Sequence, residues 1–305
     1  RLHYLEWGDR SGIPLIWLHG YGSTAFELAE VAPSLVSMGY HVYAITYRGH
    51  GKSQVDGEFS IYTIADDVAD FMRELGIPCA TIGGWSLGGN VTTAFYSAYP
   101  EKVRAIALVD GGAVWPQLLT EAYATLRQEA ELTMQESLDS DPRQLTFETR
   151  ESGVEWVMAN YLAGFVRPMD SALAAYAYSF LLPDGSGKWK LHYNHEKLMG
   201  SWADLDDLAG AHRLKLLPRS HRSILPEVIY RHLDVPVLLI DPTGDDEALF
   251  SRTPWYIQLR DQHSEWIEYV EYADTPHAAH LNRPEWFLRD MNRLLQRTDG
   301  SNCIE

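Results

Sequence analysis

The sequence predicts an α/β fold in which a mostly parallel sheet is covered by helices on both faces. Short apolar runs recur through the first 112 residues, and most are followed by segments with apolar residues spaced three and four apart. Uninterrupted apolar strands are typical of parallel sheets that are buried on both faces. The three-and-four spacing is that of an amphipathic helix. The same alternation returns near the C-terminus.

Each element follows from this pattern in chain order. The N-terminal residues 1–4 have the character of a strand. Further strands are expected at 13–18, 41–46, 79–83, 103–109, 235–240 and 266–272. Amphipathic helices are expected at 61–75, 87–99 and 286–295, and a shorter helical pattern follows the strand at 13–18. Because strands and helices alternate, the strands should lie parallel in one sheet.

The chain of 305 residues is long enough for a core with a large insertion. We expect one α/β core made of residues 1–112 and 234–297. The range 113–233 is rich in aromatic residues and shows no convincing strand, so we expect a helical cap or lid inserted between core strands. Residues 298–305 should form a flexible tail.

The charge balance excludes some classes of partner. The chain has 25 basic and 42 acidic residues, a net charge of −17, and no run of basic residues. Nucleic acids and anionic membranes are therefore not expected partners, because both are held largely through Lys and Arg. The uncharged range 76–100 is interrupted by several glycines and should not form a membrane helix. With no visible signal peptide, we expect a cytoplasmic protein; the sequence predicts no particular oligomeric state.

A candidate nucleophile stands between the third buried strand and the helix after it. Gly84-Trp85-Ser86-Leu87-Gly88 matches the pattern G-x-S-x-G. At such a position a sharp, strained turn can hold a serine hydroxyl above the edge of a sheet. Small residues are needed on both sides because the backbone turns so tightly. The pattern alone is common, and its place between strand and helix is what favours Ser86 as a nucleophile.

A serine nucleophile needs donors that stabilise the negative charge of the tetrahedral intermediate. His19-Gly20-Tyr21-Gly22 directly follows the first apolar run. The backbone N–H groups of Tyr21 and Leu87 are therefore the expected oxyanion hole. The alternative is a plain glycine turn after a strand.

The serine also needs a base, which should come near the C-terminus. His277 and His280 both qualify, and His277 is favoured because it falls in the loop directly after the last strand. His280 lies nearer the final helix and can be a packing residue. The two are spaced as metal ligands often are, but no third ligand stands at a suitable spacing, so we expect no metal.

The acid that orients the histidine is less well defined by the sequence. Asp245 and Asp246 follow the strand at 235–240, and Asp110 follows the strand at 103–109. Both loops should open toward the same edge of the sheet as Ser86. We favour Asp245, keep Asp246 and Asp110 as alternatives, and give little weight to Asp241.

Taken together, these residues resemble the α/β-hydrolase superfamily. The resemblance rests on His19-Gly20, on the Arg48-Gly49-His50-Gly51-Lys52-Ser53 turn, on the Gly84 to Gly88 motif, and on His277 seven residues before Pro284. It covers both core segments and implies an α/β-hydrolase fold. The Gly-Trp-Ser-Leu-Gly-Gly version is similar to that of lid-bearing bacterial carboxylesterases. Superfamily members that are epoxide hydrolases or dehalogenases use an aspartate nucleophile, and Ser86 argues against both.

The resemblance and the candidate residues together imply a serine hydrolase of the carboxylesterase or lactonase type that needs no cofactor. Its expected substrate is a small to medium, apolar carboxylic ester or lactone. An aminopeptidase similar to proline iminopeptidases and a C–C bond hydrolase are alternatives on the same core. An aminopeptidase would need a lid carboxylate to hold an amine, for which the candidates are Glu151, Glu155, Asp204, Asp206 and Asp207. A ligand receptor built on a hydrolase scaffold is the alternative that is not an enzyme.

Overall fold

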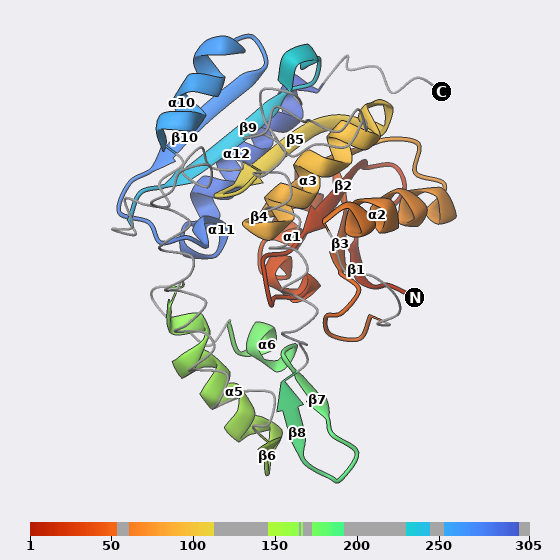
Figure 1. Cartoon of the computed structure of the whole chain (residues 1–305), viewed down its shortest axis with the longest axis vertical. Coiled ribbons are helices and arrows are strands. Elements are labelled where there is room, and N and C mark those ends of the chain that lie inside the picture. The colour runs from red at the N-terminus through yellow and green to blue at the C-terminus, as the bar shows by residue number, and fades with distance from the viewer. Residues whose placement is uncertain are drawn as a thin grey trace, which may run out of the picture.

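The computed structural model describes residues 1–53, 61–112, 146–164, 166, 173–191, 230–244 and 253–298 (Figure 1). A seven-stranded sheet forms the centre, in the order β1-β3-β2-β4-β5-β9-β10. Its strands are β1 His3–Trp7, β2 Ile13–Leu18, β3 Tyr40–Thr46, β4 Ala80–Trp85, β5 Val103–Val109, β9 Val237–Pro242 and β10 Ile267–Tyr272. Every pairing is parallel except that of β1 with β3. The predicted α/β class and its mostly parallel sheet are confirmed.

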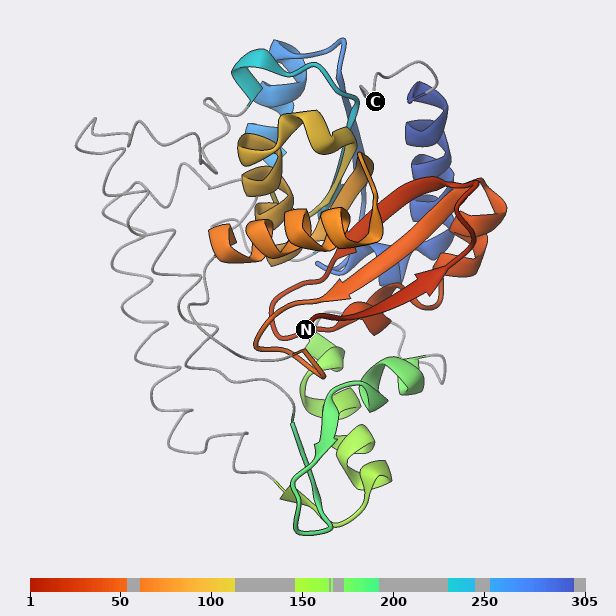
Figure 2. The ribbon, with the colours of Figure 1, turned by 90° about the vertical axis from the view of Figure 1, so that its right-hand side faces the viewer.

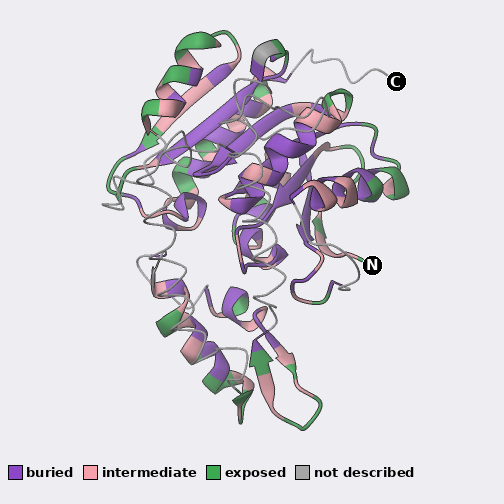
Figure 3. Cartoon of the chain, viewed as in Figure 1, coloured by how far each residue is buried: buried purple, intermediate pink, exposed green. Residues whose placement is uncertain are grey.

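Helices cover both faces of this sheet (Figure 2). One layer contains α2 Ile61–Leu75, α3 Leu87–Ala98 and α10 Thr253–Gln262, and the other contains α1 Ala32–Ser37, α11 Ala279–Asn282 and α12 Pro284–Arg297. In β2, Ile16 and Leu18 pack into the first layer, whereas Leu15 and Trp17 pack into the second. Because successive strand side chains point to opposite faces, one apolar run fills both layers. Figure 3 shows the resulting buried central strands.

The core elements agree closely with the predicted ranges. The helix 61–75 and the strands 13–18 and 103–109 have the expected bounds. The strands predicted at 41–46 and 266–272 differ by one residue at their start, those at 79–83 and 235–240 by one or two residues at each end, and β1 by two or three. Helix α10 was not predicted, because its hydrophobic pattern is weak and only Tyr256 and Leu259 are buried. Three short 3-10 helices complete the core: η1 Ala25–Leu28, η2 Pro100–Lys102 and η6 Tyr230–His232.

The described residues within 146–191, which we call the insert, lie beyond one end of the sheet (Figure 1). They contain α5 Arg150–Asn160, η5 Leu162–Gly164 and α6 Leu173–Tyr178. They also contain a small antiparallel sheet of β6 Thr146–Phe147, β8 Trp189–Leu191 and β7 Leu181–Pro183. The expectation that the range 113–233 has no strand is therefore wrong. Strands of two or three residues are too short to show an alternating pattern.

Two remaining expectations concern the ends and the membrane. Thr298 is not part of a loose tail, because it is buried and its hydroxyl donates to the Leu295 carbonyl at 2.6 Å. The rest of the predicted tail, residues 299–305, lies outside the described residues. Among the helices that are described, none combines the length and the apolar character that a bilayer crossing requires.

Candidate active site

Ser86 stands alone in the turn between β4, which ends at Trp85, and α3, which begins at Leu87. Its φ of 53° and ψ of −115° are a strained conformation for a residue with a side chain. The neighbouring glycines make the turn possible. A Cβ at position 84 would stand 2.3 Å from the Gly88 carbonyl carbon, and one at position 88 would stand 1.9 Å from the Leu18 oxygen. This is the sharp strand-to-helix turn that the sequence predicts.

His277 lies in the loop between β10 and α11, and its Nδ1 is hydrogen-bonded to Oδ2 of Asp110. Trp85, the last residue of β4, holds this loop through two contacts with His277. The indole Nε1 donates to the His277 carbonyl at 3.1 Å, and the two rings lie 5.2 Å apart. The side chain of His277 is 30% exposed and that of Asp110 is 12% exposed. The imidazole is thus oriented from one side and accessible from another.

Asp110 and Ser86 follow neighbouring strands at the same edge of the sheet. The register pairs Trp85 with Val109, and the Ser86 amide donates to the Val109 carbonyl at 2.9 Å. Asp110 has a φ of 43°, and its amide donates to the Ile240 carbonyl of β9 at 3.0 Å. The left-handed backbone turns the chain away from the strand direction directly after β5. The sheet therefore places the predicted serine and Asp110 after neighbouring strands at one edge, where Asp110 meets the predicted histidine.

The acid that meets His277 is thus Asp110, which was one of two equal alternatives to Asp245 in the sequence. Asp245 and Asp246, the first choice and its neighbour, lie outside the described residues. Asp241 is buried, and its Oδ2 accepts hydrogen bonds from Thr253 at 2.6 Å and from Tyr269 at 2.8 Å. Those contacts give Asp241 a role in joining β9, α10 and β10.

His19 holds the loop of residues 20–24 on the side of the core. This loop carries the predicted oxyanion donor Tyr21. The Tyr47 amide donates to His19 Nε2 at 3.1 Å, so the proton of a neutral ring is on Nδ1, which lies 2.7 Å from the Gly20 carbonyl. The Tyr47 hydroxyl also donates to the His19 carbonyl at 2.9 Å. These bonds explain why the motif begins with histidine: the side chain fixes the start of the loop.

A buried carboxyl that the sequence analysis did not single out holds the same loop. Glu27 accepts from Trp17 Nε1 at 2.7 Å, from the Ser23 hydroxyl at 2.6 Å and from the Gly20 amide at 3.3 Å. It is fully buried, and burial raises its pKa to about 8, although these hydrogen bonds act in the opposite direction. In the sequence, Glu27 is simply one acidic residue in a helical pattern, so only its tertiary contacts reveal it.

His280 completes this buried cluster and is not available to solvent. Its Nε2 lies 3.8 Å from Glu27 Oε1, and its ring packs 5.5 Å from Trp85 and 5.4 Å from Trp17. Burial is the main reason that its pKa is lowered to about 3. Among the described residues, neither ring nitrogen has a hydrogen-bond partner. The packing interpretation of His280 fits these contacts.

The insert contacts the 20–24 loop from the other side. The Tyr161 hydroxyl donates to the Tyr21 carbonyl at 2.7 Å. The hydroxyls of Tyr176 and Ser23 lie 2.5 Å apart, and those of Ser179 and Thr24 lie 2.6 Å apart. The loop is therefore fixed between the core and the insert. None of these insert residues was a candidate from the sequence, because they lie far from the loop along the chain.

The chain belongs to the α/β hydrolase fold family, whose model matches residues 13–284. A pig protein, bifunctional epoxide hydrolase 2, is 32% identical over 110 residues, which are 35% of this chain and 20% of that protein. Lipase 3 of Moraxella sp. is 27% identical over 118 residues, 38% of this chain and 37% of the lipase. The chain thus spans well under half of these curated relatives.

Solved structures agree with the family over nearly the whole chain. The crystal structure of E-2-(acetamidomethylene)succinate hydrolase is similar with a TM-score of 0.70 at 20% identity, and the likeness covers 97% of this chain and 95% of that one. At this identity the likeness concerns the fold alone. Relatives that include an epoxide hydrolase and a lipase leave the reaction to be decided by the residues at the site.

Proposed function

We propose that the protein is a serine hydrolase that cleaves a carboxylic ester through an acyl-enzyme. The proposal is carried by one observation: Ser86 is held in a strained turn at the sheet edge where His277 is hydrogen-bonded to Asp110. In this proposal Ser86 is the nucleophile, His277 the base and Asp110 the acid. This assignment replaces Asp245, the first choice from the sequence.

The reaction follows from these positions. His277 accepts the proton of the Ser86 hydroxyl as its oxygen attacks the ester carbonyl carbon, and Asp110 stabilises the resulting imidazolium. The amides of Tyr21 and Leu87 donate to the oxyanion. Leu87 is the first residue of α3, where helical N–H groups have no partner within the helix. His277 then protonates the leaving alkoxide, and water attacks the acyl-enzyme in the same way.

The insert serves in this proposal as the lid that selects the substrate. It supplies Tyr161 and Tyr176, which contact the loop that carries Tyr21. An ester or lactone ranks before a peptide, because an alkoxide leaves more easily than an amine. Glu151 and Glu155, the described candidates for holding a substrate amine, are both exposed. The other three candidates, Asp204, Asp206 and Asp207, lie outside the described residues.

The test is to treat the protein with a fluorophosphonate and to map the adduct by mass spectrometry. We expect a single adduct on Ser86, because only a serine activated by a base and an oxyanion site reacts quickly. The variant Ser86→Ala should lose the label, whereas Ser37→Ala, at an exposed serine of α1, should keep it. Labelling elsewhere, or no labelling of the folded wild-type protein, contradicts the proposal.

The substrate class is then sorted with short p-nitrophenyl esters, lactones, aminoacyl anilides and a C–C substrate. Preference for esters supports the carboxylesterase, and a preference for lactones supports the lactonase. Turnover of the anilides alone supports an aminopeptidase and contradicts esterase activity. If the cellular role survives in Ser86→Ala, the protein acts as a receptor and not as an enzyme.

A further inference from the structure

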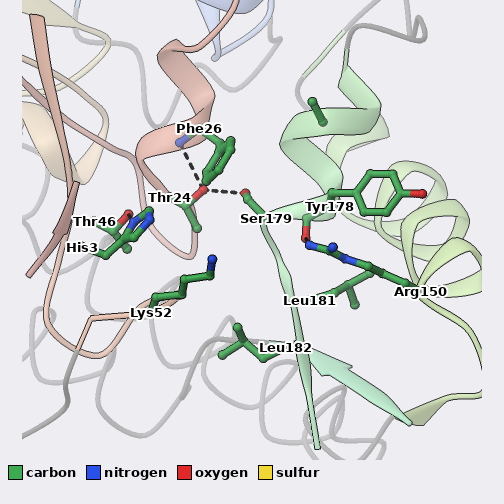
Figure 4. Close-up of a pocket in the computed structure, with 12 residues that line it drawn as sticks. His3, Thr24, Phe26, Thr46, Lys52, Arg150, Tyr178, Ser179, Leu181 and Leu182 are labelled. Carbon is green, nitrogen blue, oxygen red and sulfur yellow. Dashed lines mark hydrogen bonds between the residues drawn. The ribbon is translucent and has the colours of Figure 1, made fainter. Parts of the chain in front are cut away.

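A small cavity lies where the core meets the insert (Figure 4). It has a volume of about 70 Å³, several times the roughly 10–15 Å³ that one water requires. Residues of β1, of the 20–24 loop and of the turn after β3 line its core side, and residues of α5, α6 and β7 line its insert side. The lining residues are His3, Thr24, Phe26, Thr46, Gly51, Lys52, Arg150, Ala175, Tyr178, Ser179, Leu181 and Leu182.

The charge of this cavity is opposite to that of the protein. The chain has a net charge of −17. The described residues that line the cavity nevertheless include Lys52, Arg150 and His3, but no Asp or Glu. Lys52 and Arg150 reach into the cavity from the core side and from the insert side (Figure 4). Two cations that share a cavity repel each other unless an anion lies between them.

Arg150 is held in place by contacts that leave its charge uncompensated. One terminal nitrogen donates to the Tyr178 carbonyl at 3.0 Å. The guanidinium carbon lies 4.7 Å from the centre of the Tyr178 ring and 4.9 Å from that of Trp189. Its Nε is buried and has no hydrogen-bond partner among the described residues. The side chain is therefore fixed by rings and by a carbonyl, and none of these contacts is a carboxylate.

Lys52 is likewise without a carboxylate on the described part of the chain. Neither an ion pair nor a hydrogen bond joins its ammonium to another described residue. The pKa of His3 lies below its ordinary value, mainly because the ring is partly buried and in addition because the positive charge of Lys52 is near. The cavity thus has a positive charge that no carboxylate of the described residues neutralises.

We propose that this cavity is a binding site for a small oxyanion, a phosphate or a carboxylate. Lys52 would bind it as a point charge from the core, and Arg150 would bind it from the insert through its planar N–H groups. The hydroxyls of Thr24 and Ser179, 2.6 Å apart, join the core to the insert at the same boundary. Because the two cations belong to different parts of the fold, a bound anion joins the insert to the core beside the 20–24 loop.

The anion can be a free solute or an anionic group of the substrate, and the experiment separates these sources. In the first arm, inorganic phosphate is titrated into the wild-type protein by calorimetry. We expect saturable binding that weakens at least tenfold in Lys52→Gln and in Arg150→Gln. Lys188→Gln is the matched control, because the side chain of this lysine is 43% exposed and paired with Glu148. Lys52 is also exposed, so its replacement should leave the fold intact.

In the second arm, p-nitrophenyl hemiesters of dicarboxylic acids are compared with esters of the matched monoacids. This arm rests on the proposed esterase activity, whereas the phosphate titration does not. If the substrate supplies the anion, Lys52→Gln raises KM for the hemiesters alone and phosphate competes with them. If the anion is a free solute, phosphate binds and both ester series respond alike. The proposal is overturned if phosphate does not bind, or if Lys52→Gln and Lys188→Gln bind it as the wild type does.

Discussion

Replacing Asp110 with asparagine should lower kcat for ester hydrolysis by about four orders of magnitude and leave the protein folded. The magnitude is that of the equivalent change in another serine hydrolase triad. Asparagine has the size of aspartate but lacks its charge, and its amide can donate to His277 Nδ1. The ring would then carry its proton on Nε2, where the base must accept one. Steady-state kinetics of Asp110→Asn, with circular dichroism to check the fold, measure this effect.

Two matched variants show whether the loss belongs to Asp110 alone. Asp245→Asn, at the position that the sequence analysis favoured, should keep kcat within a few-fold of the wild type. Asp241→Asn should instead lower stability, because its carboxylate accepts hydrogen bonds from Thr253 and Tyr269. A large loss of kcat in Asp245→Asn together with an active Asp110→Asn would reverse the assignment of the acid.

The fold was predictable because the signals that carry it are local. The central strands are rich in apolar residues, as in Val103–Val109, and α2 shows the helical spacing over its whole length. The elements that were missed lack such signals. Strands β6, β7 and β8 have two or three residues each, and α10 buries only Tyr256 and Leu259. Their positions depend on what they pack against and not on their own sequence.

The candidate site was predictable where one short motif contains all the information. The glycines around Ser86 indicate the turn in the sequence, because a Cβ at Gly84 or Gly88 would clash with neighbouring backbone atoms. The choice between Asp110 and Asp245 has no such signal, since both follow a buried strand. It depends on the left-handed turn at Asp110 and on where the His277 loop returns to the sheet. Both are properties of the assembled sheet.

The burial of Glu27 is likewise visible only in the folded structure. It predicts how the free energy of unfolding depends on pH. Its pKa is raised to about 8 in the folded protein from an ordinary value of 4.5. Between these values the folded state binds a proton that the unfolded state has released. The free energy of unfolding therefore falls as pH rises from 4.5 to 8, by up to roughly 5 kcal/mol, and Glu27 contributes no further change above pH 8.

Two buried histidines, His280 and His50, make the free energy of unfolding rise with pH, so their effect must be separated from that of Glu27. Burial lowers the pKa of His280 to about 3 and that of His50 to about 4, so both make stability rise with pH up to 6.5. The difference between the wild type and Glu27→Gln removes their contribution, since both proteins contain them. The free energy of unfolding of Glu27→Gln minus that of the wild type should therefore increase by several kcal/mol between pH 5 and pH 8 and then stay constant.

Urea denaturation at each pH unit from 5 to 9 measures this difference. Glu101→Gln, which changes an exposed glutamate, should run parallel to the wild type throughout. Parallel curves for Glu27→Gln as well would mean that Glu27 ionises normally in the fold. If the difference instead grows with pH as expected, ionisation places a negative charge against the Gly20 amide and Ser23. Both groups donate to Glu27, so ionisation strengthens these two hydrogen bonds, and the loss of stability comes from the cost of burying the charge.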